Sequence, residues 1–284
     1  MLSARLGVGL AALVLVACTA SPPSHQPDSG FAYRTALAQL LPTDVLIVGE
    51  QHDVAQHQRL HLAVVQQLAQ EHRLGALALE MASAGSSTES LSTWAPESEV
   101  QTALHWQNEA WPWAAYGPAV MAAVRAGVVV KGANLPANRL REAMKEAALD
   151  GLLSGPALKA QQQAIRLGHC GLLPESQIRP MTRVQIARDI SMAQTVASLV
   201  KAGKTVVLLT GNGHAERTLG VPLHLPRNLT SKVVLLQANQ GPQATHSVAN
   251  FDQTWATEAA PATDYCADLE ASHALPTPPP AATP

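Results

Sequence analysis

The segment 45–53 constrains the fold more than any other part of the sequence. It opens with Val-Leu-Ile-Val, a short apolar and mostly β-branched run that is typical of a buried strand. A glycine follows, and Glu50, His52 and Asp53 then place carboxylates and an imidazole where the strand ends. In open α/β sheets, ligands bind in the crevice outside the carboxyl ends of the strands. We therefore expect this strand to present polar groups to a ligand.

Four further apolar runs predict strands of the same kind. They are residues 76–79, 128–130, 205–210 and 233–236. Near-continuous apolar strands belong to sheets that are covered on both faces, and the segments between these runs have helical patterns. The length suits one domain with a sizeable core. The sequence therefore predicts a single-domain α/β fold with a mostly parallel sheet and helices on both faces.

Two of the intervening helices have recognisable start signals. The sequences Asp-x-x-Gln at 53–56 and Thr-x-x-Gln at 182–185 have the spacing of capping boxes. We expect the first to open a helix that continues to about His72, and the second to open a helix that stops near Gly203.

Polar side chains should meet at one edge of this sheet. The residues expected at the carboxyl edge are Glu50, His52, Glu80, Asn134 and His214. His57 falls in the first turn of the helix after His52 and would lie beside the strand ends, whereas His61 lies a turn deeper and is expected to be a hydrogen-bonded packing residue. A lone histidine is usually a satisfied, partly buried imidazole. The convergence of several histidines with two carboxylates favours a functional site instead.

The segment 85–118 departs from the strand and helix alternation because it is rich in aromatic residues. Only 4% of the chain is aromatic, yet this segment holds Trp94, Trp106, Trp111, Trp113 and Tyr116. Two interpretations are open. The rings either pin a helical insertion onto the core, or form an aromatic lid over the sheet edge that suits a flat apolar ligand.

The N-terminus has the features of a bacterial lipoprotein signal. Arg5 is followed by an apolar run from Leu6 to Ala17, which is too short to be a stable membrane-spanning helix. The ending Leu-Val-Ala-Cys resembles a lipobox, which predicts a signal peptide over residues 1–17 and lipidation of Cys18. Acyl chains on that cysteine would tether the protein to a membrane.

The remaining composition sets the boundaries of the domain and limits its partners. Residues 18–30 read as a flexible tether and residues 271–284, rich in proline and alanine, as a disordered tail. The folded domain should therefore span residues 31–270. A formal net charge of −2 with 14% charged residues offers no basic stripe, so we expect no nucleic-acid partner. Cys170 and Cys266 are either bridged or free, and the sequence leaves both open.

Two chemistries fit histidine, glutamate and asparagine at strand ends. A divalent transition metal held by imidazole and carboxylate could activate water for hydrolysis. Alternatively, a haem would need axial ligands and an apolar slot for its porphyrin. The sequence has no Cys-x-x-Cys-His, which excludes covalent c-type attachment, and no Gly-x-Ser-x-Gly elbow of an α/β-hydrolase serine nucleophile.

A series of motifs in this order resembles the ChaN family of haem-binding bacterial lipoproteins, in the Tiki superfamily. The matching motifs are Val48-Gly49-Glu50-x-His52-Asp53 with His57, Leu79-Glu80-Met81, Trp113-x-x-Tyr116-x-Pro118, Gly168-His169-Cys170, Ala187-Arg188-Asp189 with Met192-Ala193, and Gly211-x-Gly213-His214 with Gly220-Val221-Pro222. No single motif is specific, but their order along most of the mature chain is.

The resemblance implies a lipid-anchored protein of the cell envelope that binds haem and its iron in connection with iron uptake. It implies the outer membrane, on the side that faces the periplasm, and a homodimer that sandwiches the ligand. Tyr116 is the tyrosine inside a matching motif, and phenolate is a known ligand of haem iron. Trp113, Trp106 and His57 complete the predicted haem-binding residues. On this reading the protein binds a ligand and is not an enzyme.

The same superfamily keeps a second class of function open. Tiki-type metalloproteases belong to it, and it is similar to the erythromycin esterases, whose Gly-Glu-x-His motif serves hydrolysis. That likeness implies a metal-dependent hydrolase with Glu50, His52 and His214 as catalytic residues. Its metal ligands would be Glu50, His52, Glu80 and His214. A third class is a structural envelope lipoprotein that has no ligand.

The lipobox gives a direct prediction. Replacing Cys18 with Ser removes the thiol that carries the acyl chains, so the variant should lose lipid modification and leave the membrane fraction. Metabolic labelling with a palmitate analogue and membrane fractionation measure both effects. A Cys18→Ser protein that is processed and membrane-bound like the parent would contradict the lipobox.

Overall fold

The computed structural model describes residues 29–239, 247–259 and 264–273. Within these residues the strands form one sheet of six strands in the order β3-β2-β4-β1-β5-β6, and every neighbouring pair is parallel. The strands are β1 (Val45–Glu50), β2 (Leu74–Ser83), β3 (Val130–Asn134), β4 (Thr205–Gly211), β5 (Ser231–Ala238) and β6 (Gln253–Thr257). The predicted single-sheet α/β fold is confirmed.

Helices connect the strands and cover the sheet. The α-helices are α1 (Ser29–Gln39), α2 (Ala55–Gln70), α3 (Glu97–Ala103), α4 (Trp113–Arg125), α5 (Leu140–Lys145), α6 (Gly155–Gly168), α7 (Glu175–Leu199), α8 (Asn212–Ala215) and α9 (Tyr265–His273). Short 3-10 helices are η1 (Ala137–Arg139), η2 (Ala147–Gly151), η3 (Val221–His224) and η4 (Val248–Asn250). No helix of the described residues is both long and apolar enough to cross a membrane.

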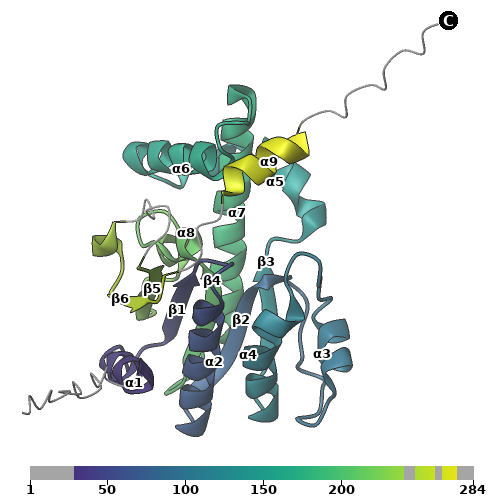
Figure 1. Cartoon of the computed structure of the whole chain (residues 1–284), viewed down its shortest axis with the longest axis vertical. Coiled ribbons are helices and arrows are strands. Elements are labelled where there is room, and N and C mark those ends of the chain that lie inside the picture. Colours follow the sequence, from purple (N-terminus) through teal and green to yellow (C-terminus); the bar gives the residue numbers. More distant parts are fainter. Residues whose placement is uncertain (1–28, 240–246, 260–263, 274–284) are drawn as a thin grey trace, which may run out of the picture.

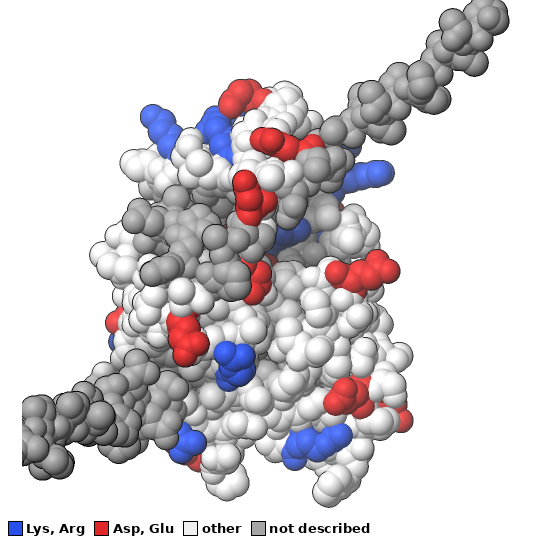
Figure 2. All heavy atoms as spheres, viewed as in Figure 1, with Lys and Arg blue, Asp and Glu red and all other residues white. Residues whose placement is uncertain are grey.

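The core has two layers, one on each face of the sheet. Helices α2 and α4 cover one face and the long helix α7 covers the other (Figure 1). Because successive strand residues point to opposite faces, Leu46 and Val48 pack in the layer of α2 and α4, whereas Val45 and Ile47 pack in the layer of α7. This explains why the central strands are apolar at nearly every position. On the surface that Figure 2 shows, acidic and basic side chains are interspersed.

The sixth strand, β6, was not expected from the sequence. It lies at the edge of the sheet beside β5, and only one of its faces is covered: Trp255 and Thr257 are buried, while Thr254 and Ala256 are exposed. A strand covered on one face alternates and shows no continuous apolar run. A polar five-residue strand therefore lacks the signal that revealed the central strands.

Both predicted capping boxes are wrong. Helix α2 begins after Val54 without a side-chain cap, and Gln56 Oε1 instead accepts a hydrogen bond from the backbone N–H of Glu258. Helix α7 begins at Glu175, so Thr182 lies inside it, where its hydroxyl donates to the carbonyl of Ile178. A threonine inside a helix can bond to the carbonyl four residues earlier as readily as it caps a helix start.

A disulfide joins the middle of the chain to its last described helix. Cys170, just after α6, is bonded to Cys266 in α9, and the two Cα atoms are 5.5 Å apart. The bridged alternative is therefore the one the structure shows. Helix α9 ends at His273, inside the segment 271–284 that was predicted as a tail. The predicted signal peptide, Cys18 and most of the predicted tether lie outside the described residues.

A close approach between β2 and β3 gives a stability prediction. A Cβ on Gly132 would lie 2.2 Å from the backbone oxygen of Ser83 and 2.4 Å from the hydroxyl of Ser86. Gly132→Ala should therefore push β3 off its neighbour and lower the free energy of unfolding by about 1–3 kcal/mol. Gly155→Ala is the matched control, because its Cβ meets no atom within 4 Å. Denaturant unfolding of both variants checks this, and equal stabilities would contradict the packing.

Candidate functional site

The carboxyl ends of three adjacent strands form the candidate site. Glu50 is the last residue of β1, Glu80 lies in β2, and His214 sits in α8 directly after β4. All three are nearly inaccessible, with 2%, 4% and 5% of their surface exposed. His52, in the loop after β1, is the open member, since 40% of its side chain is exposed. Asn134 also lies at this edge, but its amide donates to the backbone carbonyl of Glu80.

The buried carboxylate of Glu50 collects donors from three elements. Its Oε1 atom accepts hydrogen bonds from Tyr116 Oη and from His52 Nδ1, both at 2.8 Å. Its Oε2 atom accepts one from Gln58 Nε2 at 2.7 Å, and His61 Nδ1 lies 3.6 Å away. Burial alone would raise the pKa of Glu50, but the nearby histidines and the hydrogen bonds outweigh it and hold the pKa below its usual range.

The pKa of both His52 and Tyr116 is raised, which favours a charged ring at His52 and a neutral phenol at Tyr116. Burial disfavours a charged ring at His52, yet the hydrogen bond to Glu50 and the charge of Glu80 raise its pKa. Burial, followed by the charge of Glu50, raises the pKa of the Tyr116 phenol far above its usual value. Tyr116 is therefore a neutral donor here, and only 3% of its surface is exposed. A phenolate at Tyr116 would first have to lose its contact with Glu50.

A second buried cluster surrounds His214. Its Nδ1 atom lies 2.6 Å from Asp189 Oδ1, and its Nε2 atom lies 3.4 Å from Glu80 Oε1. Glu80 also accepts hydrogen bonds from the hydroxyl of Thr210 and the backbone N–H of Gly211, both at 2.7 Å. Burial works against charge on His214, but the two carboxylates raise its pKa to about 10. The ring is thus a fixed cation between two acids.

The two clusters touch through His52. A Cβ on Gly211 would lie 2.8 Å from His52 Nε2 and 3.7 Å from Glu80 Oε2, so only a glycine leaves space for the His52 ring here. Within the described residues no hydrogen-bond partner is found for His52 Nε2. The site is therefore a continuous polar edge with one accessible imidazole.

The aromatic segment packs against this edge. Trp111 meets the His52 ring edge-on with centroids 4.8 Å apart. Trp106 donates its indole N–H to the carbonyl of Trp111, and Trp113 donates its own to Glu97. Trp113 is 9% exposed and belongs to the core layer of α2 and α4. Trp106 and Trp113 thus pin the insertion to the core, and Trp111 is the ring that borders the accessible edge.

The two other predicted histidines are buried behind the edge. Both ring nitrogens of His57 are occupied: Nδ1 accepts from the backbone N–H of Gln51 at 2.9 Å, and Nε2 lies 3.0 Å from Thr257 Oγ1. Burial lowers the pKa of His57 to about 4. This ring supports the loop and presents no free nitrogen to a ligand. His61 was expected to be hydrogen-bonded, but neither of its nitrogens has a hydrogen-bond partner among the described residues.

The sequence analysis predicted no site role for several residues that complete the site. Gln58 bonds Glu50, Gln185 Nε2 lies 3.1 Å from His214 Nδ1, and Asp189 pairs with that ring. Asp189 lies three and four residues before Met192 and Ala193, which face the core from the same helix. A carboxylate on an otherwise buried helical stripe was the signal that could have identified it.

The predicted set of four metal ligands divides between the two clusters. Glu50 and His52 pair with each other, and Glu80 and His214 pair with each other. In the described part of the chain, no group of three or more histidine, cysteine, aspartate or glutamate side chains is arranged to hold a metal ion. The geometry therefore favours hydrogen-bonded pairs.

A family model and one solved structure agree with this architecture. A family model described as haem-binding uptake, Tiki superfamily, ChaN matches residues 36–225. The solved structure described as cofacial heme binding to ChaN of Campylobacter jejuni is similar, with a TM-score of 0.62 and 23% identity over 73% of this chain and 87% of that one. The structure of the type III effector HopBA1 matches with a TM-score of 0.45 and 16% identity, over 83% and 95% of the two chains. No curated protein matches the sequence.

The raised pKa of His214 predicts a dependence of stability on pH. A ring with a pKa of about 10 in the folded state and about 6.5 when unfolded contributes its full stabilisation below pH 6.5. This contribution should be lost as the pH rises toward 10. His214→Gln should remove that part of the slope, which urea unfolding at several pH values measures. Equal slopes in parent and variant above pH 6.5 would show that His214 is not held as a cation.

Proposed function

Because the chain belongs to the ChaN family of haem-binding uptake proteins, we propose that it binds haem at the carboxyl edge of its sheet. The observation that supports this location is the accessible imidazole of His52 beside the indole of Trp111. An imidazole nitrogen is a common ligand of haem iron, and a porphyrin needs an apolar ring to pack against. Glu50, Glu80 and His214 are buried and already paired.

We propose His52 as the residue that faces the iron. Its Nδ1 atom is hydrogen-bonded to Glu50, which fixes the ring and makes Nε2 the stronger donor toward a metal. Tyr116 was the ligand expected from the sequence, and it remains the competing candidate. Its phenol is buried and donates to the same oxygen of Glu50, so in this geometry it positions the carboxylate that orients His52.

The cellular role extends this proposal. We propose an exported lipoprotein, anchored through Cys18 to the outer membrane on its periplasmic side, that takes part in haem or iron uptake. The Cys170–Cys266 disulfide supports export, because disulfides persist in oxidising compartments. Cofacial haem binding is described for ChaN of Campylobacter jejuni. For this chain we propose a homodimer in the presence of haem.

One observation favours a second candidate, a hydrolase. An accessible imidazole oriented by a buried carboxylate is the arrangement of a general base, and His52 with Glu50 has it. Under this reading the cation at His214 would stabilise developing negative charge from behind the edge. Haem binding is the stronger proposal, since the matched family is a haem-binding one.

A hemin titration of the purified full chain, followed through its Soret band, tests the first proposal. The parent should bind, and His52→Ala should bind at least about tenfold more weakly, which corresponds to about 1.4 kcal/mol. Tyr116→Phe should keep the ferric spectrum of the parent. The control is His72→Asn. His72 is exposed and lies just after the C-terminal end of α2, whereas the site lies at the other end of that helix.

Three outcomes would contradict parts of this proposal. A parent protein without a Soret change would refute haem binding. A shifted ferric spectrum in Tyr116→Phe with an unchanged one in His52→Ala would identify the tyrosine as the ligand. Ester or peptide hydrolysis by the haem-free chain that is lost in His52→Ala would favour the second candidate.

A further inference from the structure

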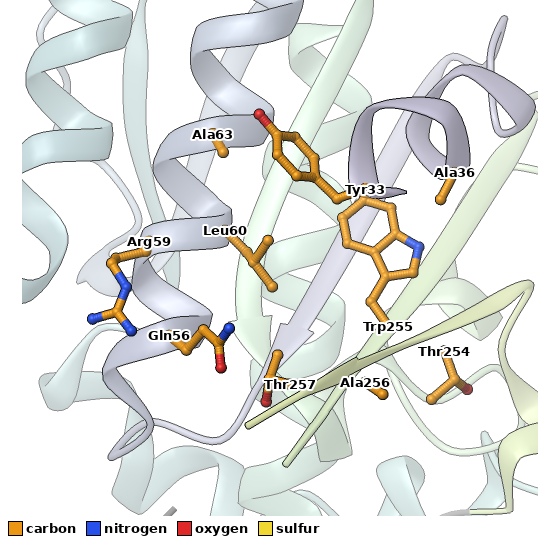
Figure 3. Close-up of a pocket in the computed structure, with 10 residues that line it drawn as sticks. All are labelled: Tyr33, Ala36, Gln56, Arg59, Leu60, Ala63, Thr254, Trp255, Ala256 and Thr257. Carbon is orange, nitrogen blue, oxygen red and sulfur yellow. The ribbon is translucent and has the colours of Figure 1, made fainter. Parts of the chain in front are cut away.

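A separate cavity of about 440 Å³ opens on the outer side of α2. Three elements distant in the sequence enclose it: α1, α2 and the edge strand β6 (Figure 3). Tyr33 and Trp255 form an aromatic wall with ring centroids 6.4 Å apart. Leu60 extends from α2 toward this wall. Its size lies in the range of small-molecule sites, which are mostly apolar with a few polar groups.

Two polar side chains of this cavity, an amide and a guanidinium, lie near one end of it. Gln56 and Arg59 extend from the start of α2, on the side of the cavity away from Trp255 (Figure 3). Arg59 is exposed, and no ion pair or hydrogen bond of its side chain is found among the described residues. Gln56 uses its oxygen to accept from Glu258, which leaves its amide N–H groups free to donate. The end of the cavity thus offers a positive charge and amide donors.

This cavity is distinct from the haem-binding edge. The family model matches residues 36–225, whereas Tyr33 and the whole of β6 lie outside that range. The His52 ring and the carboxylate of Glu50 do not line it. The β6 wall and Tyr33 therefore lie outside the family match, whereas Ala36 and α2 lie within it.

We propose that this cavity binds a small organic anion with an apolar body, of the fatty-acid class. The body would pack between Tyr33, Trp255 and Leu60, and the carboxylate would lie at Arg59 and Gln56. A neutral apolar ligand would make no ion pair with the guanidinium. A small inorganic anion would make no contact with the aromatic wall. The combination of an aromatic wall with a guanidinium at one end of the cavity selects for both properties.

The test uses the full chain, anilinonaphthalene sulfonate as a fluorescent probe, and dodecanoate and acetate as competitors. Dodecanoate should displace the probe, and acetate should not, because acetate lacks the apolar body. Arg59→Gln should weaken dodecanoate binding about tenfold, in the range expected for a lost hydrogen-bonded charge. Arg141→Gln, an exposed arginine of α5 outside the cavity, is the matched control.

A second variant fills the cavity without changing charge. Ala63 lines it from α2 and is only partly buried, so Ala63→Phe should block the probe while the thermal unfolding temperature stays near that of the parent. Hemin affinity should be unchanged in Ala63→Phe and Arg59→Gln. Probe binding that survives both substitutions would refute the site. A parallel loss of hemin affinity would refute its independence from the haem-binding edge.

Discussion

The carboxylate of Glu50 is the group on which the arrangement of the site depends. A buried carboxylate is costly unless its oxygens are hydrogen-bonded, and Glu50 meets this requirement with donors from the loop after β1, from α2 and from α4. Each donor belongs to a different part of the chain. Satisfying one charge therefore fixes how the loop, the first turns of α2 and the aromatic insertion sit relative to each other.

The same requirement applies at the end of the neighbouring strand β4, where the buried charge is positive. His214 is a buried cation, and Glu80 and Asp189 neutralise it from β2 and α7. The edge thus holds two buried charges side by side. The anion accepts hydrogen bonds from neutral and partly charged donors, and the cation is flanked by two anions. Between them lies His52, whose side chain is partly exposed and whose ring occupies the space that Gly211 leaves. Loss of either cluster should disturb the other through this shared contact.

The sequence predicted the parts of the fold that depend on strong periodicity. The central strands are apolar over most of their length, so their place and the residues at their ends, Glu50, Glu80 and His214, could be identified. Weak local signals failed: Thr182 looked like a cap but lies inside α7, and β6 is too polar and short to stand out. Partners such as Asp189 and Gln58 depend on tertiary packing, which spacing along one helix reveals only in part.

The aromatic insertion shows why composition could not choose between its two interpretations. A tryptophan that pins a segment and one that borders a ligand are the same residue in sequence, and only its neighbours separate them. Trp113 lies over Gly117, where a Cβ would come within 2.5 Å of its ring, while Trp111 reaches the accessible His52. The role of each tryptophan therefore depends on its neighbours in the folded structure, which composition does not give.

The disulfide has a consequence for how the protein withstands proteolysis. Cys170 and Cys266 are 96 residues apart, and the segment between them includes the long helix α7 and the strands β4, β5 and β6, which are half of the sheet. A single cleavage anywhere in that segment would leave both pieces covalently joined. In an oxidising compartment a nicked molecule would thus keep its fragments together, and the damage would become visible as separate chains only after reduction.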